Sequence, residues 1–225
     1  MNFAKVLSEA TTLLIEGIKL TIGISLLSIL IGVIIGLLTC LMGMSKNKIL
    51  KGISAVYVWI IRGTPMIVQA FVVYFGFPQL IQQTISPTFT LNAFSAGIVT
   101  LSLNAGAYLS EIFRSGIEAV DPGQIEASRS LGISSGTTMR KIVLPQAFKI
   151  TIPSLVNQFI ITVKDTSILS VIGLAEIVNK AKVYVGATYQ FFATYILVAV
   201  YYLVVISVLM MLSKFVEKKF KYDKR

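Results

Sequence analysis

The chain has 225 residues, of which 55% are hydrophobic and only 13% are charged, and its mean hydropathy is +0.82. Soluble domains carry about a quarter charged residues, so this composition excludes an ordinary soluble protein and indicates a membrane protein. The formal net charge of +10 does not indicate nucleic-acid binding, because the basic residues mostly flank apolar segments. The absence of histidine excludes histidine-based metal sites, and the single Cys40 cannot form an internal disulfide.

Five apolar segments approach or exceed the roughly 20 residues that a membrane-spanning helix needs. The predicted spans are residues 20–44, 54–79, 91–109, 148–165 and 191–212. The first is too long for the apolar part of a signal peptide, which is about 7–15 residues, so we expect it to be retained. Residues 167–184 are only partly apolar and predict a short re-entrant or interfacial helix. We therefore predict an all-α integral membrane protein whose single domain covers residues 1–225.

Charge asymmetry predicts the orientation of these spans. Five spans place the termini on opposite sides, and with the C-terminus inside, fifteen of the twenty Lys and Arg residues lie on the cytoplasmic side. The remaining five are Lys5, Lys19, Lys180 and Lys182 outside and Lys164 at membrane depth. The positive-inside rule therefore predicts an N-out/C-in topology, with the loop before the fourth span in the cytoplasm.

This loop covers about residues 121–146 and is polar and basic. It opens on the turn signal Asp121-Pro122-Gly123, after which a helix can start near Gln124 and run to about Leu131. Gly132 then suits the position after a helix, where a positive φ is needed.

A second short helix follows in the prediction, with Ser134 or Ser135 as its cap. Pro145 is expected to limit any continuation of this helix into the fourth span. The loop is thus predicted to be a compact helix–turn–helix held at both ends.

The stretch Glu126-Ala127-Ser128-Arg129-Ser130-Leu131-Gly132, followed by Ile142-Val143-Leu144-Pro145, resembles the EAA loop of ABC importer permeases. Ser128 replaces the second alanine of that pattern. In that family the loop docks onto a separate ATPase, whereas the alternative interpretation is a solvated loop without a partner. The resemblance implies ATPase-coupling roles for Glu126, Ala127, Ser128, Leu131, Gly132 and Pro145.

Three further segments resemble the polar amino acid uptake branch of the same family: Arg62–Pro65, Ala107–Ile117 and Lys164–Leu169. The resemblance implies a type I ABC importer permease fold, a second permease subunit and an extracytoplasmic substrate-binding protein. It also implies a multi-pass protein of the bacterial plasma membrane that is not itself an enzyme. The chain has no G-x-x-x-x-G-K-[ST] phosphate loop, so ATP and Mg are expected on a partner subunit.

Polar residues near the end of the fourth span are candidates for substrate binding. Asn157 and Lys164 are seven residues apart and share a helix face, and Gln158 and Asp165 share the next face. Asp165 suits an ammonium or a cationic side chain, and Lys164 suits a carboxylate. The alternative is an internal Lys164–Asp165 ion pair, because ionisable groups at membrane depth often pair with each other.

The third span carries Asn104, Tyr108 and Glu111 at helical spacing. Asn104 and Glu111 are substrate-path candidates, although Glu111 is favoured as the ion-pair partner of Arg114. In the second span, Thr64 is expected to cap a helix that begins at Pro65. Arg62 is expected to be an anchor on the cytoplasmic side. Gly32 and Gly36 form a G-x-x-x-G that permits close helix approach without by itself indicating a dimer.

Together these features predict the membrane-spanning subunit of an ATP-driven importer of polar amino acids. The negative charges of Asp165 and Glu111 suit a basic substrate. The alternatives are a secondary transporter or channel, which would need coupling-ion sites and usually an internal repeat, and a membrane scaffold without transport.

Overall fold

The computed structural model describes residues 3–219, and its regular elements are all helices. The basic tail residues Lys221, Lys224 and Arg225, which enter the charge count, lie outside this range. The helices are α1 (Phe3–Gly43), α2 (Lys48–Gly63), α3 (Met66–Phe71), η1 (Val72–Gly76), α4 (Phe77–Thr84), α5 (Ala93–Glu118), α6 (Pro122–Ser130), α7 (Ser135–Thr138), η2 (Met139–Val143), α8 (Leu144–Asp165), η3 (Thr166–Ile172), α9 (Ile177–Thr188) and α10 (Phe191–Lys219). The all-α prediction is confirmed for these residues.

Within the described range, three helices are long and apolar enough to cross a membrane: α1, the continuous helix Ser135–Ile172, and α10. The bent pair α2 and Met66–Thr84 makes a fourth if it counts as one span. The third predicted span corresponds to α5, which is not among these helices and in which serines, glycines and Asn104 interrupt the apolar sequence. The number of five spans and their orientation therefore stay predictions.

The predicted second span, residues 54–79, is interrupted at Arg62–Pro65, where the sequence predicts that a new helix begins. The chain bends by 107° between α2 and the helix that begins at Met66. The bend follows from Pro65, because a proline disfavours helical backbone in the residue before it. Thr64 accordingly has φ −121° and ψ 144°, which is extended.

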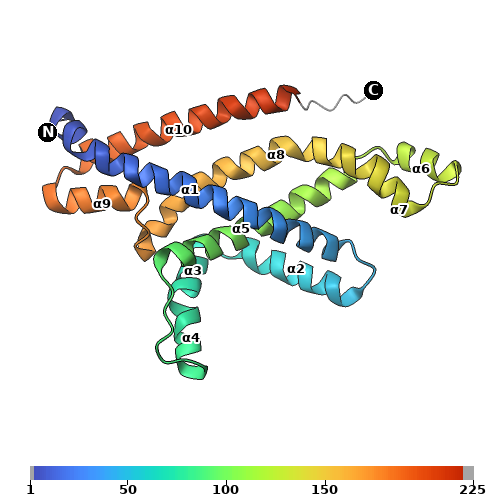
Figure 1. Ribbon diagram of the computed structural model, residues 1–225, viewed down its shortest axis with the longest axis horizontal. Coiled ribbons are helices and arrows are strands. Elements are labelled where there is room, and N and C mark those ends of the chain that lie inside the picture. The colour runs from blue at the N-terminus through green and yellow to red at the C-terminus, as the bar shows by residue number, and fades with distance from the viewer. Residues whose placement is uncertain (1–2, 220–225) are drawn as a thin grey trace.

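Figure 1 shows α1, α5, α8 and α10 running along the long axis of the molecule. The turn between α1 and α2 and the α6–α7 loop lie toward one end, while α9 and the N-terminus lie at the other. The arm formed by α3 and α4 stands away from these long helices. Two of the segments that carry the predicted cytoplasmic basic residues therefore share one end of the fold.

Close packing of α1 against α5 forms the centre of the bundle. Added at Gly36, a Cβ atom would lie 2.8 Å from Cβ of Leu109. At Gly106, it would lie 2.6 Å from Cγ2 of Ile35 and 2.9 Å from the hydroxyl of Tyr57. The glycines of the G-x-x-x-G thus face α5 of the same chain, as small residues do where membrane helices approach closely.

Between α8 and α10 lie η3, which is the end of the spanning helix Ser135–Ile172, and α9, which is not among the helices counted as spans. Glu176 is fully buried, and its carboxylate caps α9 by accepting from the backbone N–H groups of Val178 (2.9 Å) and Asn179 (2.7 Å). Burial raises the pKa of Glu176 to about 7, against the lowering effects of these bonds, of Tyr202 and of Lys182. A short helix was predicted here, and the structure shows that its start is fixed by a buried acidic cap.

We predict that Gly106→Ala lowers the unfolding free energy by about 1–3 kcal/mol, because the new methyl group must displace Ile35 and Tyr57. Gly23→Ala is the matched control, since a Cβ there meets nothing within 4 Å and alanine favours a helix by up to about 1 kcal/mol. The measurement is thermal unfolding of the purified protein with a thiol-reactive dye that reports exposure of the buried Cys40. Equal unfolding temperatures for the two variants would contradict the packing argument.

Candidate functional site

Two short helices form the loop after α5. α6 begins at Pro122, slightly earlier than predicted, and Asp121 caps it by accepting from the backbone N–H of Gly123 at 2.8 Å. After α6, Gly132 has φ +74°, which confirms the predicted positive φ. Backbone bonds from Leu131 to Ala127 (3.2 Å) and from Gly132 to Arg129 (3.0 Å) then use carbonyl groups of the last turn.

A buried pair of hydroxyl groups holds the two helices together. The Oγ atom of Ser128 in α6 lies 2.8 Å from Oγ1 of Thr138 in α7, and Thr138 also donates to the carbonyl of Ser134 at 3.1 Å. Ser134, not Ser135, is the cap of α7, with its Oγ accepting from the N–H of Thr137. The loop is therefore braced internally and can move as one unit.

The predicted coupling residues differ in exposure. Glu126, Ala127, Leu131 and Gly132 are exposed, and Leu131 is 79% exposed. Ser128 is only 3% exposed, because it faces Thr138. The structure therefore leaves these four positions and Pro145 exposed to a partner, while Ser128 braces the two helices. The coupling roles of the six residues stay predictions.

The expectation that Pro145 limits the continuation of the loop into the fourth span is wrong. Residues 139–143 form a π-helical turn, in which the N–H of Leu144 bonds to the carbonyl of Met139, and the helix continues from Ser135 to Ile172. Pro145 occupies the first turn of α8, where a missing N–H is tolerated. Gln146 adds a link back to α6 through its Nε2, which donates to Oε1 of Gln124 at 2.6 Å.

A cavity of about 430 Å³ lies where α3, α5 and α8 meet. Its polar lining includes Asn104, Gln158 and Asp165, three of the six predicted substrate residues. Its other lining residues are Thr64, Pro65, Met66, Tyr108 and Ile161. We call it the Asp165 cavity.

A second cavity of about 430 Å³, here called the Arg62 cavity, adjoins the first because Tyr108 lines both. It contains Glu111, whose carboxylate lies 2.7 Å from Nη2 of Arg114 and 3.5 Å from Nη1 of Arg62. The favoured Glu111–Arg114 ion pair is thereby confirmed. Glu111 also faces a cavity, so the two interpretations of this residue are compatible.

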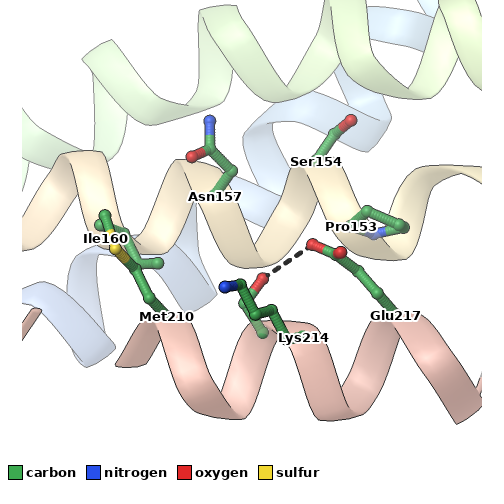
Figure 2. Close-up of a pocket in the computed structure, with 8 residues that line it drawn as sticks. Pro153, Ser154, Asn157, Ile160, Met210, Lys214 and Glu217 are labelled. Carbon is green, nitrogen blue, oxygen red and sulfur yellow. Dashed lines mark hydrogen bonds between the residues drawn. The ribbon is translucent and has the colours of Figure 1, made fainter. Parts of the chain in front are cut away.

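The other two predicted substrate residues lie elsewhere. Asn157 lines a different cavity, of about 420 Å³, between α8 and α10 with Lys214 and Glu217, as Figure 2 shows. Lys164 is exposed and lines none of these three cavities. Among the described residues, the ion pairs do not include one between Lys164 and Asp165. The predicted polar strip is therefore divided between two sides of α8.

A residue that the sequence analysis did not single out organises the break after α2. Nε2 of Gln69 donates to the carbonyls of Ile61 (2.7 Å) and Thr64 (3.0 Å), and its Oε1 accepts from Nδ2 of Asn104 at 3.1 Å. Thr64 does not cap the next helix, since α3 begins at Met66 with no side-chain cap. The position of a lone amide four residues after Pro65 is the signal that indicates Gln69.

Comparison with known proteins places the chain in one family. The family described as "Binding-protein-dependent transport system inner membrane component" matches residues 12–222. The chain is 35% identical over 206 residues to a putative glutamine transport system permease protein of Rickettsia prowazekii and 38% identical over 208 residues to the arginine transport system permease protein of Bacillus subtilis. Each alignment covers 92% of both proteins.

Solved structures agree with these relatives. An amino acid ABC transporter crystallised with histidines matches with a TM-score of 0.91 and 38% identity, covering 97% of this chain and 99% of that chain. An inward-facing methionine ABC transporter matches in fold, with a TM-score of 0.75 and 19% identity over 93% of this chain and 97% of that one. The family model and the near full-length relatives together show that the chain belongs to the binding-protein-dependent transport system inner membrane components, the multi-pass permease subunits of ABC transporters.

Proposed function

We propose that this chain forms the translocation path of an ATP-driven importer for polar amino acids and receives its driving motion through the α6–α7 loop. One observation carries the proposal: a single continuous helix joins that loop to the Asp165 cavity. The helix runs from Ser135 to Ile172, with the π-helical turn near its start and Gln158 and Asp165 toward its end. A displacement of the loop would therefore move cavity-lining side chains directly.

The partners in this proposal follow from the family. A pair of separate ATPase subunits binds ATP and Mg and docks on the loops of two permease subunits, alike or homologous. A substrate-binding protein delivers cargo from the outer side. The permease alternates between two conformational states. ATP binding and hydrolysis can shift this equilibrium only if the ATPase binds the two states with different affinities. The proposal also includes five spans with an N-out/C-in orientation. It is supported by the α1–α2 turn and the α6–α7 loop, which lie toward the same end of the molecule in Figure 1.

Two observations support the proposed substrate class. Relatives are named as permeases for glutamine, arginine and cystine, all of them amino acids with polar features. In this chain the Asp165 cavity offers one carboxylate beside two amide side chains, Asn104 and Gln158. A half-buried carboxylate with neutral polar neighbours suits a cationic group, so we propose basic amino acids as the preferred cargo.

We predict that Gly132→Val uncouples the ATPase from the permease. A β-branched residue at φ +74° is strained by about 1–2 kcal/mol or more, which shifts the loop equilibrium by about five- to thirtyfold. The measurement is ATPase activity stimulated by the loaded binding protein in proteoliposomes that contain the complete complex.

Gly136→Val is the matched control for this experiment, because Gly136 is exposed and a Cβ there meets nothing within 4 Å. Assembly is verified for both variants by size-exclusion chromatography. Stimulated activity that is the same in the two variants would remove the support for coupling through this loop.

We predict that Asp165→Asn reduces arginine uptake by about tenfold or more, because a charge-assisted hydrogen bond contributes about 1.5–3 kcal/mol. The control is Lys164→Gln, which removes a neighbouring charge outside the cavity and should leave uptake unchanged. Uptake is measured in proteoliposomes and divided by the amount of assembled complex. Loss of uptake in proportion to lost assembly would show that Asp165 is structural, and uptake without the ATPase would favour a secondary transporter or channel.

A further inference from the structure

The length of α2 separates Arg62 from the basic turn that precedes this helix. α2 begins beside the basic turn that contains Lys46, Lys48 and Lys51, and Arg62 lies in its last turn. The 14 residues from Lys48 to Arg62 span about 21 Å at 1.5 Å per residue. Because a hydrocarbon core is about 30 Å thick, a basic turn at the membrane surface puts Arg62 at membrane depth. Ionisable residues at this depth face the protein interior and mark pathways for polar cargo.

The environment of Arg62 fits that position. Its guanidinium carbon lies 5.4 Å from the centre of the Tyr108 ring, an arrangement typical of a cation–π contact. The Arg62 side chain is 44% exposed and lines the cavity that it shares with Tyr108 and Glu111. The guanidinium is therefore held against α5 and still has an open side.

The neighbouring acidic group does not use the donors of Arg62. Glu111 receives its hydrogen bonds from Arg114, at 2.7 Å and 3.4 Å, and Arg114 also bonds to Glu118 at 3.0 Å. The approach of Arg62 to Glu111 is longer, at 3.5 Å. Among the hydrogen bonds of the described residues, none is donated by the Arg62 guanidinium, which has five N–H groups.

We propose that Arg62 binds the α-carboxylate of the transported amino acid. The inference rests on the proposed function and deepens it by assigning the two ends of the cargo. An amino acid needs an anionic partner for its cation and a cationic partner for its carboxylate. Asp165 supplies the first in one cavity, Lys164 lies outside, and Arg62 supplies the second in the neighbouring cavity, which Tyr108 also lines. A planar guanidinium matches a carboxylate in a two-point contact that an ammonium cannot make.

The broken helix holds Arg62 in place for this contact. The carbonyls of Ile61 and Thr64, on either side of Arg62 and Gly63, both accept from the side chain of Gln69. Asn104 of the Asp165 cavity donates to the same amide at 3.1 Å. The backbone that carries Arg62 is thus tied to the wall of the neighbouring cavity, which makes the separation of the two charge partners a fixed property of the fold.

The test compares L-arginine with agmatine, which keeps the guanidinium and an amine but lacks the carboxylate. Each is titrated against the detergent-purified permease–ATPase complex without binding protein, and the half-maximal concentration for thermal stabilisation is measured. The wild-type complex should prefer L-arginine, and Arg62→Gln should lose this preference by about tenfold or more. Arg62→Lys should retain part of it. The matched control Lys51→Gln removes a charge at the opposite end of α2, where Lys51 is exposed, and should keep the wild-type preference.

The outcomes separate this inference from the proposed function. An Arg62→Gln complex that is intact and still prefers L-arginine to agmatine as strongly as wild type overturns the carboxylate role. A variant that weakens both ligands equally also overturns it, because a purely structural Arg62 would act on the whole cavity. If the wild-type complex responds to neither L-arginine nor L-glutamine and transports neither, the amino acid importer assignment itself fails.

Discussion

The unbroken helical path from α7 into α8 is the feature on which this account depends. A proline at position 145 would interrupt an ordinary α-helix by removing one N–H donor and crowding the preceding turn. The π-helical turn at residues 139–143 precedes it, and Pro145 falls in the first turn of α8. The side chain of Gln146 bonds to Gln124 in α6, and Ser128 bonds to Thr138 across the loop. A force on the exposed residues of α6 therefore reaches α8 through packed helix without a flexible hinge.

The helix break beside the Asp165 cavity depends on a second constraint. Backbone N–H and C=O groups inside a membrane protein need hydrogen-bond partners. Breaking the helix at Gly63 to Pro65 frees carbonyl groups from their helical donors, and each group left unsatisfied within a bilayer costs several kcal/mol. Gln69 bonds to two of these carbonyls and accepts from Asn104. The same three-part contact joins α2, α3 and α5 beside the Asp165 cavity. The residues that stabilise the helix break therefore also hold the wall of the proposed pathway.

The sequence correctly predicted those structural features that depend on a single helix. The positive φ of Gly132 and the Glu111–Arg114 pair follow from spacing along one element, and both are present. Spacing could not predict that Asn157 and Gln158 line different cavities. Adjacent helical positions point about 100° apart, and the packing of neighbouring helices determines which cavity each position faces. The prediction placed the break near the start of the second span, whereas a 16-residue helix, α2, precedes it, and the length of that helix could not be read from the apolar pattern alone. The position of Gln69 after Pro65 is visible in the sequence, but its contacts with α2 and α5 depend on the tertiary structure.

The most direct test of coupling through the α6–α7 loop is thiol protection by the partner ATPase. In a Cys40→Ser chain, Leu131→Cys and Tyr189→Cys place single thiols at positions that are 79% and 78% exposed. The first position lies between α6 and α7 and the second directly follows α9, and Figure 1 shows the α6–α7 loop and α9 toward opposite ends of the molecule. Both should react with a water-soluble maleimide at similar rates in the isolated permease. Addition of the ATPase is predicted to protect position 131 and to leave position 189 unchanged. Equal reactivity at position 131 with and without the ATPase, or protection at position 189 instead, would contradict the account.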